Sequence, residues 1–172
     1  SKEFADFTIT CTSPSKTFNL AGLQISNIFI SNPQIRETFK QEINRAGYSQ
    51  LNVAGLVGCE AAYSDGEEWY EAMKVYVAAN IEYTKEYVEQ YLSGVSMTEH
   101  EGTYLVWLDF RGTGLGVEEL EDLIIHKAKL WLDSGKIFGE KGKGFQRINV
   151  ACPRATLTEA LERIRKALEE RK

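Results

Sequence analysis

Residues 12–24 read TSPSKTFNLAGLQ, and this stretch places one lysine, Lys16, in a polar turn. Over residues 6–11, just before the turn, apolar side chains alternate with threonines, which predicts a strand that delivers the chain into it. A second strand is expected over residues 24–30. The order of strand, turn and strand therefore places Lys16 at the end of a small sheet.

Lys16 has two interpretations at this point. In the first, it is a solvated loop lysine, and the neighbouring serines make turn hydrogen bonds. In the second, partial loss of water at the end of the sheet favours the neutral amine, which is then available for Schiff-base formation. Ser13 and Ser15 would in that case offer hydroxyl donors to a phosphate group. The spacing of these residues does not decide between the two.

Two helices are expected next along the chain. Asn32 is the expected cap of a helix that begins at Pro33 and ends at Gly47. Residues 51–62 are small and apolar nearly all round, which predicts a buried helix. Together with the two strands, these helices form an expected first lobe of residues 1–64.

A long helix is expected over residues 66–92. Asp65 and Glu68 resemble a capping box, and neither proline nor glycine follows until Gly94. A helix of this length exceeds the usual globular size and is best placed as a connection between two lobes. Residues 65–94 are therefore expected to join two domains.

Residues 95–172 alternate strand, helix, strand and helix, which predicts a small α/β domain. Trp131 is placed on the apolar face of the first of these helices, and Thr156 and Glu159 form an expected capping box for the second. The other segments expected are a strand over 103–110, a helix over 117–132 and a strand over 145–151.

The composition restricts the possible partners. The 172 residues include 20 Lys plus Arg against 25 Asp plus Glu, for a net charge of -5. This balance argues against nucleic acid or an anionic membrane as a partner, because both attract basic surfaces. Short apolar runs and the absence of a leader pattern at the start favour a cytoplasmic protein. Three separated cysteines and two histidines suggest buried thiols and no metal site.

Three stretches of the chain resemble one family. Residues 13–23 (SPSKTFNLAGL) look like the lysine segment of fold-type I pyridoxal-phosphate enzymes of aminotransferase class I and II. Residues 107–154 resemble the C-terminal lobe of the carbon–sulfur β-lyases (cystathionine β-lyases) of that class, and residues 52–63 (NVAGLVGCEAAY) resemble a segment that follows their lysine. The resemblance covers nearly the whole chain. It implies the C-terminal part of the PLP-dependent transferase fold: a remnant of the large domain and a small α/β domain, joined by a long helix.

The resemblance implies roles for three residues. Lys16 matches the lysine that binds pyridoxal 5′-phosphate (PLP) covalently, and Ser13 matches a hydroxyl that binds the cofactor phosphate, while Ser15 stays a candidate from its place in the turn. Arg147 matches the arginine that holds the substrate α-carboxylate, a role that suits a planar guanidinium with two parallel donors. The alternative for Arg147 is a pairing with a surface acid. Relatives in the class carry arginine eight residues after the lysine, where this chain has Gln24.

The implied activity is that of a carbon–sulfur β-lyase that cleaves small amino-acid substrates, cysteine S-conjugates, to pyruvate, ammonia and a thiol. An aminotransferase is the alternative within the fold. The family's phosphate loop, ring-stacking aromatic residue and pyridine-binding aspartate lie upstream of its lysine, whereas this sequence begins fifteen residues before Lys16. We therefore expect the C-terminal portion of a homodimeric enzyme, inactive by itself. A catalytically incompetent fragment with a structural or interaction role is the further alternative.

Overall fold

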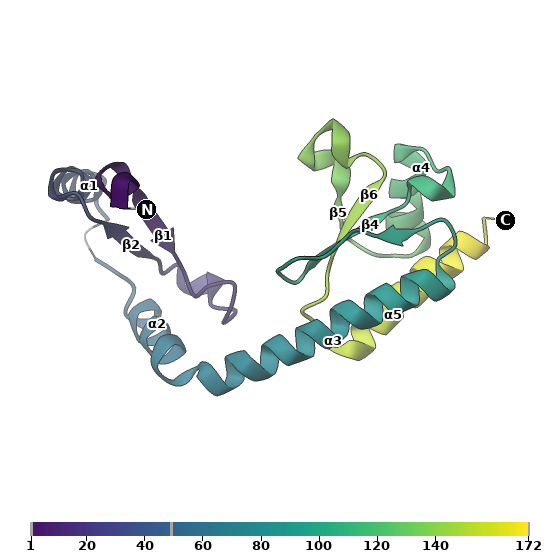
Figure 1. The fold of residues 1–172 in the computed structure, drawn as a ribbon, viewed down its shortest axis with the longest axis horizontal. Coiled ribbons are helices and arrows are strands. Elements are labelled where there is room, and N and C mark those ends of the chain that lie inside the picture. Colours follow the sequence, from purple (N-terminus) through teal and green to yellow (C-terminus); the bar gives the residue numbers. More distant parts are fainter. Residues whose placement is uncertain (1, 49, 172) are drawn as a thin grey trace. The chain divides into compact units, whose positions relative to one another are not determined.

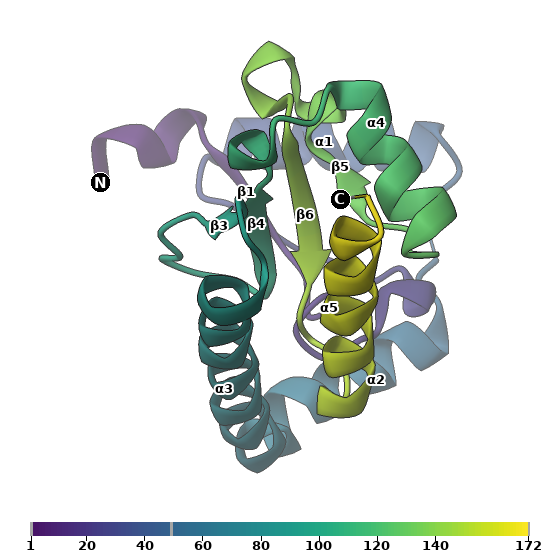
Figure 2. The same cartoon turned by 90° about the vertical axis from the view of Figure 1, so that its right-hand side faces the viewer.

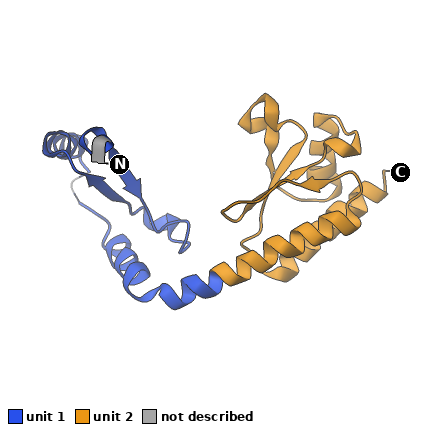
Figure 3. Ribbon diagram, in the orientation of Figure 1, with its two compact units in different colours: residues 1–73 blue, residues 74–172 orange. Residues whose placement is uncertain are grey.

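The chain forms two compact units (Figure 3). The computed structural model describes residues 2–48 and 50–171. The first unit comprises residues 1–73 and the second residues 74–172, so the boundary falls inside the long helix α3 (Glu67–Tyr91). The helix expected over 66–92 is thus confirmed. The division into three parts, with the helix as a separate connecting segment, stays a prediction.

The first unit is built on one antiparallel pair of strands (Figure 1). β1 (Ile9–Thr12) pairs with β2 (Asn27–Ile30) along the full length of both strands. A 3-10 helix, η1 (Lys2–Phe7), precedes β1, and the 3-10 turn η2 (Ala21–Leu23) lies between the strands. Both predicted strands are confirmed, but they are shorter than expected, because residues 6 and 7 belong to η1 and β2 begins only at its asparagine.

Helix α1 (Pro33–Arg45) begins where the sequence predicts. The Asn32 side-chain oxygen accepts hydrogen bonds from the backbone N–H groups of Gln34 and Ile35, and the proline lies in the first turn, where its missing N–H has no cost. The helix ends shortly before Gly47, which has a φ of +80°, a left-handed conformation that favours glycine.

Helix α2 (Val53–Asp65) is less buried than the sequence predicts. Val53 is 74% exposed and Val57 is 61% exposed. A two-stranded sheet has too little area to cover a helix that is apolar all round, so the expected burial is wrong for this chain. The buried positions of α2 are Gly55, Cys59 and Ala62.

Two expected capping boxes are also wrong. Asp65 is the last residue of α2 rather than the cap of α3, and Gly66 separates the two helices. Helix α5 (Arg154–Glu169) begins ahead of the expected Thr156, and no side chain caps it. Pro153 lies at the N-cap position, and its restricted φ starts the helix earlier than the capping pattern suggests.

The second unit contains a four-stranded antiparallel sheet in the order β3–β4–β6–β5. The central strands, β4 (Leu105–Asp109) and β6 (Phe145–Asn149), alternate between fully buried and more exposed positions, and both were predicted. The outer strands, β3 (Ser96–Met97) and β5 (Asp133–Ser134), have two residues each. Such short strands leave no periodic pattern, so the sequence does not predict them.

Helix α5 runs beside α3 and packs against the sheet (Figures 1 and 2). Leu157, Leu161 and Ile164 of α5 are buried, as the helical period predicts. These leucine and isoleucine side chains complete the hydrophobic core of the second unit. Its other fully buried large side chains include Val88, Val106, Leu108, Phe110 and Val150.

Helix α4 (Val117–Asp122) is shorter than the helix expected over residues 117–132. It widens into a π-helical turn over Leu123–Lys127, and Lys129 then takes a φ of +55°, which turns the chain out of the helix. Trp131 therefore does not lie on a helical apolar face and is 88% exposed. The prediction that Trp131 lies on the apolar face of this helix is wrong.

Asn80 of α3 is a polar side chain without solvent exposure. Its Nδ2 donates to the carbonyl oxygens of Val150 at 2.7 Å and Cys152 at 2.9 Å. Its Oδ1 accepts from Nε of Arg154 at 2.7 Å. The amide thus uses both of its N–H donors and its oxygen to join α3 to the segment between β6 and α5.

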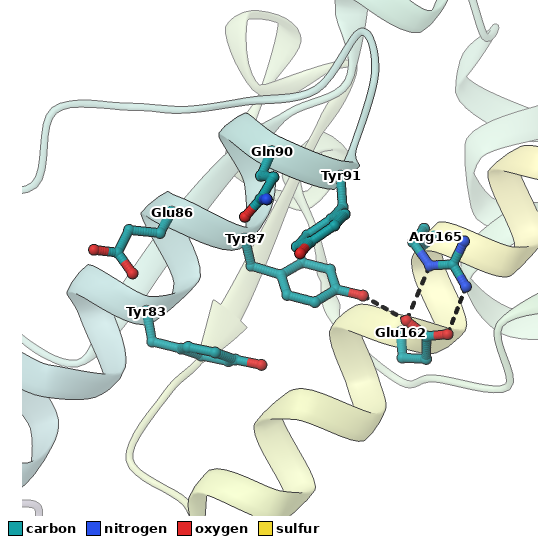
Figure 4. A pocket seen from close by; sticks show the side chains of 7 residues that line it. All are labelled: Tyr83, Glu86, Tyr87, Gln90, Tyr91, Glu162 and Arg165. Atoms are coloured by element: carbon teal, nitrogen blue, oxygen red, sulfur yellow. Dashed lines mark hydrogen bonds and ion pairs between the residues drawn. The ribbon is translucent and has the colours of Figure 1, made fainter.

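A groove of about 510 Å³ in the second unit is lined by tyrosines of α3 and charged residues of α5 (Figure 4). The Tyr87 hydroxyl donates to Oε2 of Glu162 at 2.6 Å, and Arg165 donates to both oxygens of that carboxylate at 2.9 and 2.6 Å. The hydrogen bonds from Arg165 and then Tyr87 lower the pKa of Glu162 to about 2. Burial, followed by the hydrogen bond to Glu162, raises the pKa of Tyr87 to about 12.

Glu162→Gln is expected to make folding stability less sensitive to acid. Since the pKa of Glu162 is lowered from 4.5 to about 2 on folding, its ionised form stabilises the fold above the unfolded-state value. That contribution is lost as the pH falls toward the folded-state pKa. Urea unfolding, followed by circular dichroism between these two pH values, should show a smaller loss in the variant than in the parent chain.

The matched control is Glu170→Gln, at the exposed end of the same helix. This control should retain the acid-dependent loss of stability of the parent chain. An equal loss in the parent and in Glu162→Gln would contradict the role given to the Glu162 carboxylate.

Within residues 2–48 and 50–171, no helix is long and apolar enough to cross a membrane, and no group of His, Cys, Asp or Glu side chains is placed to hold a metal ion. The cysteines are unpaired. Cys59 is buried, Cys152 is half-buried and Cys11 is exposed. The expected burial of Cys11 is wrong, because every residue of β1 is exposed in this unit.

Candidate active site

The lysine turn, residues 14–19, is one turn of helix with a defined end. The backbone N–H of Phe18 donates to the carbonyl oxygen of Pro14, and the N–H of Leu20 donates to that of Ser15, both at 2.9 Å. The second of these bonds spans six residues, as at a helix C-terminus that ends in a left-handed residue. These two backbone hydrogen bonds hold the ends of the turn together.

Lys16 lies in the middle of this turn and is exposed. Asn19, three residues later, has a φ of +55° and ends the helical turn. The partial loss of water expected in the second interpretation is not seen in the described part of the first unit, where the side chain is exposed. The turn offers the amine to an incoming molecule.

Ser13 fixes the start of the turn. Its hydroxyl donates to the carbonyl oxygen of Ile25 at 2.6 Å and accepts from the backbone N–H of Ser15 at 3.1 Å. A hydroxyl has one hydrogen to donate, so Ser13 can bind a phosphate oxygen through it only after that hydrogen turns away from Ile25. Within the described chain, the hydroxyl of Ser15 has no hydrogen-bond partner and remains available.

Phe18 anchors the other end of the turn. Its ring contacts those of Trp69 and Tyr63, at centroid distances of 5.5 and 6.4 Å. A Cβ atom on Gly66 would lie 2.6 Å from the Phe18 ring, so the absence of a side chain there lets the ring pack between α2 and α3. The aromatic contact fixes the turn against the helices of its own unit.

A pocket of about 260 Å³ lies beside the turn, but it does not suit a phosphate. Ser13 and Phe18 line it, whereas Lys16 does not. Glu67 also lines it and brings a carboxylate, which repels a phosphate group. The pocket therefore does not include the Lys16 amine, and the reactive role of that amine stays a prediction.

Arg147 lies on β6 in the second unit, opposite Asp133 of β5 and Trp107 of β4. Its Nε and Nη2 donate to one oxygen of Asp133, Oδ2, at 3.1 and 2.6 Å. Its Cζ lies 4.7 Å from the centre of the Phe138 ring and 5.9 Å from that of Trp107. The pairing with an acid that the sequence left as an alternative is thus present, and the carboxylate-binding role of Arg147 stays a prediction.

The structure brings together three of the four residues expected at the site. Ser13, Ser15 and Lys16 share one turn of the first unit, and Arg147 belongs to the second unit. Gln24, which replaces the arginine of relatives, has a φ of +50° and is exposed at the end of η2. An amide at this position carries no charge for a phosphate.

Two side chains beside Arg147 are not predicted from the sequence. Asp133 lies on a strand of two residues, and Phe138 lies in a 3-10 helix, η5 (Gly135–Phe138), so neither has a periodic neighbour pattern. One sequence signal points to Asp133: it directly follows the apolar residues Leu130, Trp131 and Leu132. An acid that follows such a run at the edge of a sheet is expected to pair with a basic side chain.

Comparisons with known proteins agree on one class. Cystathionine β-lyase PatB of Bacillus subtilis is 39% identical over 168 residues, which cover 98% of this chain and 43% of that protein. The PLP-containing crystal structure of cystalysin from Treponema denticola superposes with a TM-score of 0.91 at 40% identity, and the match covers 100% of this chain and 44% of that one. A PLP-bound protein from Clostridium difficile matches with a TM-score of 0.93 at 42% identity, over 98% of this chain and 43% of that chain.

The fold and the lysine turn therefore define the C-terminal part of a PLP-dependent transferase fold, as the resemblance implied. The chain spans less than half the length of the relatives that it matches. It belongs to the aminotransferase class I and II family, which matches residues 2–164. PLP is the cofactor of this family, and the structural neighbours bind it.

Proposed function

We propose that this chain is the C-terminal portion of a PLP-dependent carbon–sulfur β-lyase. Such an enzyme cleaves a cysteine S-conjugate, for example cystathionine, to pyruvate, ammonia and a thiol. The observation that carries the proposal is Lys16, exposed on a hydrogen-bonded turn in a chain 39% identical to a cystathionine β-lyase. The amine there is the nucleophile that the cofactor aldehyde requires.

The side chains of the turn suit the aldehyde of PLP fully and its phosphate in part. Lys16 supplies the primary amine that bonds to the aldehyde. The Ser15 hydroxyl, which has no hydrogen-bond partner among the described residues, can donate to a phosphate oxygen. Ser13 adds a second hydroxyl once it gives up its hydrogen bond to the carbonyl oxygen of Ile25. With Gln24 in place of arginine, this segment leaves most of the phosphate charge to partners in the remainder of the enzyme.

Two residues of this chain would act on the substrate. When bound, PLP accepts electrons from Cα of the amino acid and so makes the Cα–H bond acidic. The amine of Lys16 would act as the general base that takes the proton from the substrate Cα. Arg147 donates parallel hydrogen bonds to the α-carboxylate and fixes the direction of the Cα–H bond. The thiolate then leaves from the β-carbon.

An aminotransferase is the second candidate, and the family match to aminotransferase class I and II favours it. It would use the same lysine and arginine, with a 2-oxo acid as the acceptor of the amino group. Product analysis separates the two candidates. A β-lyase releases pyruvate and thiol from its substrate alone, whereas an aminotransferase needs an added 2-oxo acid.

A structural or interaction role for an inactive fragment is the third candidate. In its favour, the turn around Lys16 offers few donors to a phosphate, because the Ser13 hydroxyl already donates to Ile25. Apolar residues of the first unit are exposed, for example Phe29 at 62% and Leu51 at 61%. We propose that further protein covers them in the complete enzyme, and that this enzyme is a homodimer. We also propose a cytoplasmic location, to which the unpaired thiols are suited.

A chimera tests the proposed reaction. This chain replaces the matching 168 residues of PatB, and the product is incubated with PLP and cystathionine. We expect pyruvate and thiol without any 2-oxo acid, at a rate within roughly a hundredfold of PatB, because the imported segment brings Lys16 and Arg147. This chain alone, as the control, should release none. Turnover that needs an added 2-oxo acid would instead establish the aminotransferase.

A further inference from the structure

We propose that Asp133 is a positioning residue that holds Arg147 so that the outer edge of its guanidinium receives the substrate α-carboxylate. The inference rests on the proposed function, since it takes Arg147 as the carboxylate-binding residue. It adds a second residue to that subsite and a defined direction of approach for the substrate.

The hydrogen bonds leave one edge of the guanidinium open. Nε and Nη2 of Arg147 both donate to Oδ2 of Asp133, at 3.1 and 2.6 Å. The acid therefore occupies the guanidinium edge formed by Nε and Nη2. Within residues 2–48 and 50–171, Nη1 has no hydrogen-bond partner. The pair Nη1 and Nη2 still presents parallel N–H groups, which match the two oxygens of a carboxylate.

Two aromatic rings restrict the guanidinium further. The Phe138 and Trp107 rings lie 4.7 and 5.9 Å from Cζ of Arg147, and the ring centres are 5.0 Å from each other. Rings over a guanidinium face hinder its rotation and cover part of that face. A carboxylate therefore approaches Arg147 in the plane of the guanidinium, at the Nη1 and Nη2 edge that Asp133 leaves open.

The backbone sets this geometry before any substrate arrives. Asp133 and Arg147 are directly opposite each other in the β5–β6 pair, and Trp107 is directly opposite Arg147 in the β4–β6 pair. The Arg147 side chain is 24% exposed, which leaves room for a ligand, whereas the Asp133 side chain is 47% exposed, so water screens its repulsion of a second carboxylate. Holding a long side chain in place beforehand lowers the entropic cost of binding.

Three possible roles of Asp133 predict different kinetics. If Asp133 positions Arg147, removing its carboxylate raises KM. Replacing it by asparagine then restores KM, because the asparagine Oδ1 still accepts a hydrogen bond. An acid that only competes with the substrate gives a lower KM on deletion. An acid that only pairs with Arg147 on the surface gives no change.

The test uses Asp133→Ala and Asp133→Asn in the PatB chimera, with Arg147→Lys as reference. We expect KM for cystathionine to rise about tenfold in Asp133→Ala, with kcat changed less than about threefold, and to return near the parent value in Asp133→Asn. Arg147→Lys should raise KM at least as much. An unchanged or lower KM in Asp133→Ala, while Arg147→Lys raises it, overturns the inference and leaves the proposed function standing.

A second readout needs no activity. In proton–nitrogen correlation spectra of the chain, the Nε–H signal of Arg147, assigned by its loss in Arg147→Lys, should be protected from exchange with water. It should persist in Asp133→Asn and broaden or vanish in Asp133→Ala. A signal equally protected in Asp133→Ala overturns the inference whether or not the chimera is active, whereas a chimera that releases no pyruvate counts against the proposed function alone.

Discussion

Lys16→Ala in the PatB chimera is expected to lower kcat for pyruvate release by roughly 10³- to 10⁴-fold. The change removes both the amine that bonds to the cofactor and the general base for the Cα proton, and a base alone contributes about 10²- to 10⁴-fold. Pyruvate release, coupled to a dehydrogenase assay, measures the loss. The visible absorption of the bound cofactor should change in the same variant.

Lys16→Arg separates the chemistry of the amine from its charge. Arginine keeps the positive charge on the exposed turn, but its guanidinium does not lose a proton at neutral pH and so cannot act as nucleophile or base. This variant should be as inactive as Lys16→Ala. Lys40→Ala, a loss of an exposed lysine on α1, should leave kcat unchanged. Activity within tenfold of the parent in Lys16→Arg would show that Lys16 acts only through its charge.

Asn80→Ala is expected to lower the free energy of unfolding of the second unit by about 2 to 4 kcal/mol. The substitution removes three hydrogen bonds of 2.7 to 2.9 Å from a side chain with no solvent exposure. The buried carbonyl of Val150 and the part-buried Cys152 carbonyl and Arg154 guanidinium then lose a hydrogen-bond partner. Urea unfolding followed by circular dichroism measures the difference.

Two controls define what Asn80 contributes. Gln90→Ala removes an exposed polar side chain from the same helix and should change stability by less than about 0.5 kcal/mol. Asn80→Asp keeps an acceptor for Arg154 but loses the two donors and places a carboxylate against carbonyl oxygens, so it should destabilise at least as much as alanine. A stability within about 0.5 kcal/mol of the parent in Asn80→Ala would show that water replaces the amide.

The elements with long, periodic patterns could be predicted from the sequence. α3 and the apolar face of α5 follow from helical spacing, and α1 follows from its asparagine cap and proline. The predictions that were wrong concern burial, which depends on tertiary contacts rather than on local sequence. The burial of α2 depends on how much sheet surrounds it, and Trp131 is exposed because a π-helical turn ends α4 early.

The lysine turn of the candidate site was predictable, but the surroundings of Arg147 were not. Lys16, Ser13 and Ser15 lie within four residues of sequence, so one motif contains them all. Asp133 and Arg147 meet only through strand pairing across fourteen residues, and the partner strand has two residues. A local sequence pattern does not predict such a contact, which depends on the register of the β5–β6 strand pair.

The site of covalent cofactor attachment tests the central claim most directly. The chimera is loaded with one equivalent of PLP, the bond between cofactor and amine is fixed by borohydride reduction, and the labelled peptides are identified by mass spectrometry. We predict that the label lies on Lys16. A label spread over exposed lysines such as Lys40 and Lys127, with none on Lys16, would contradict the account.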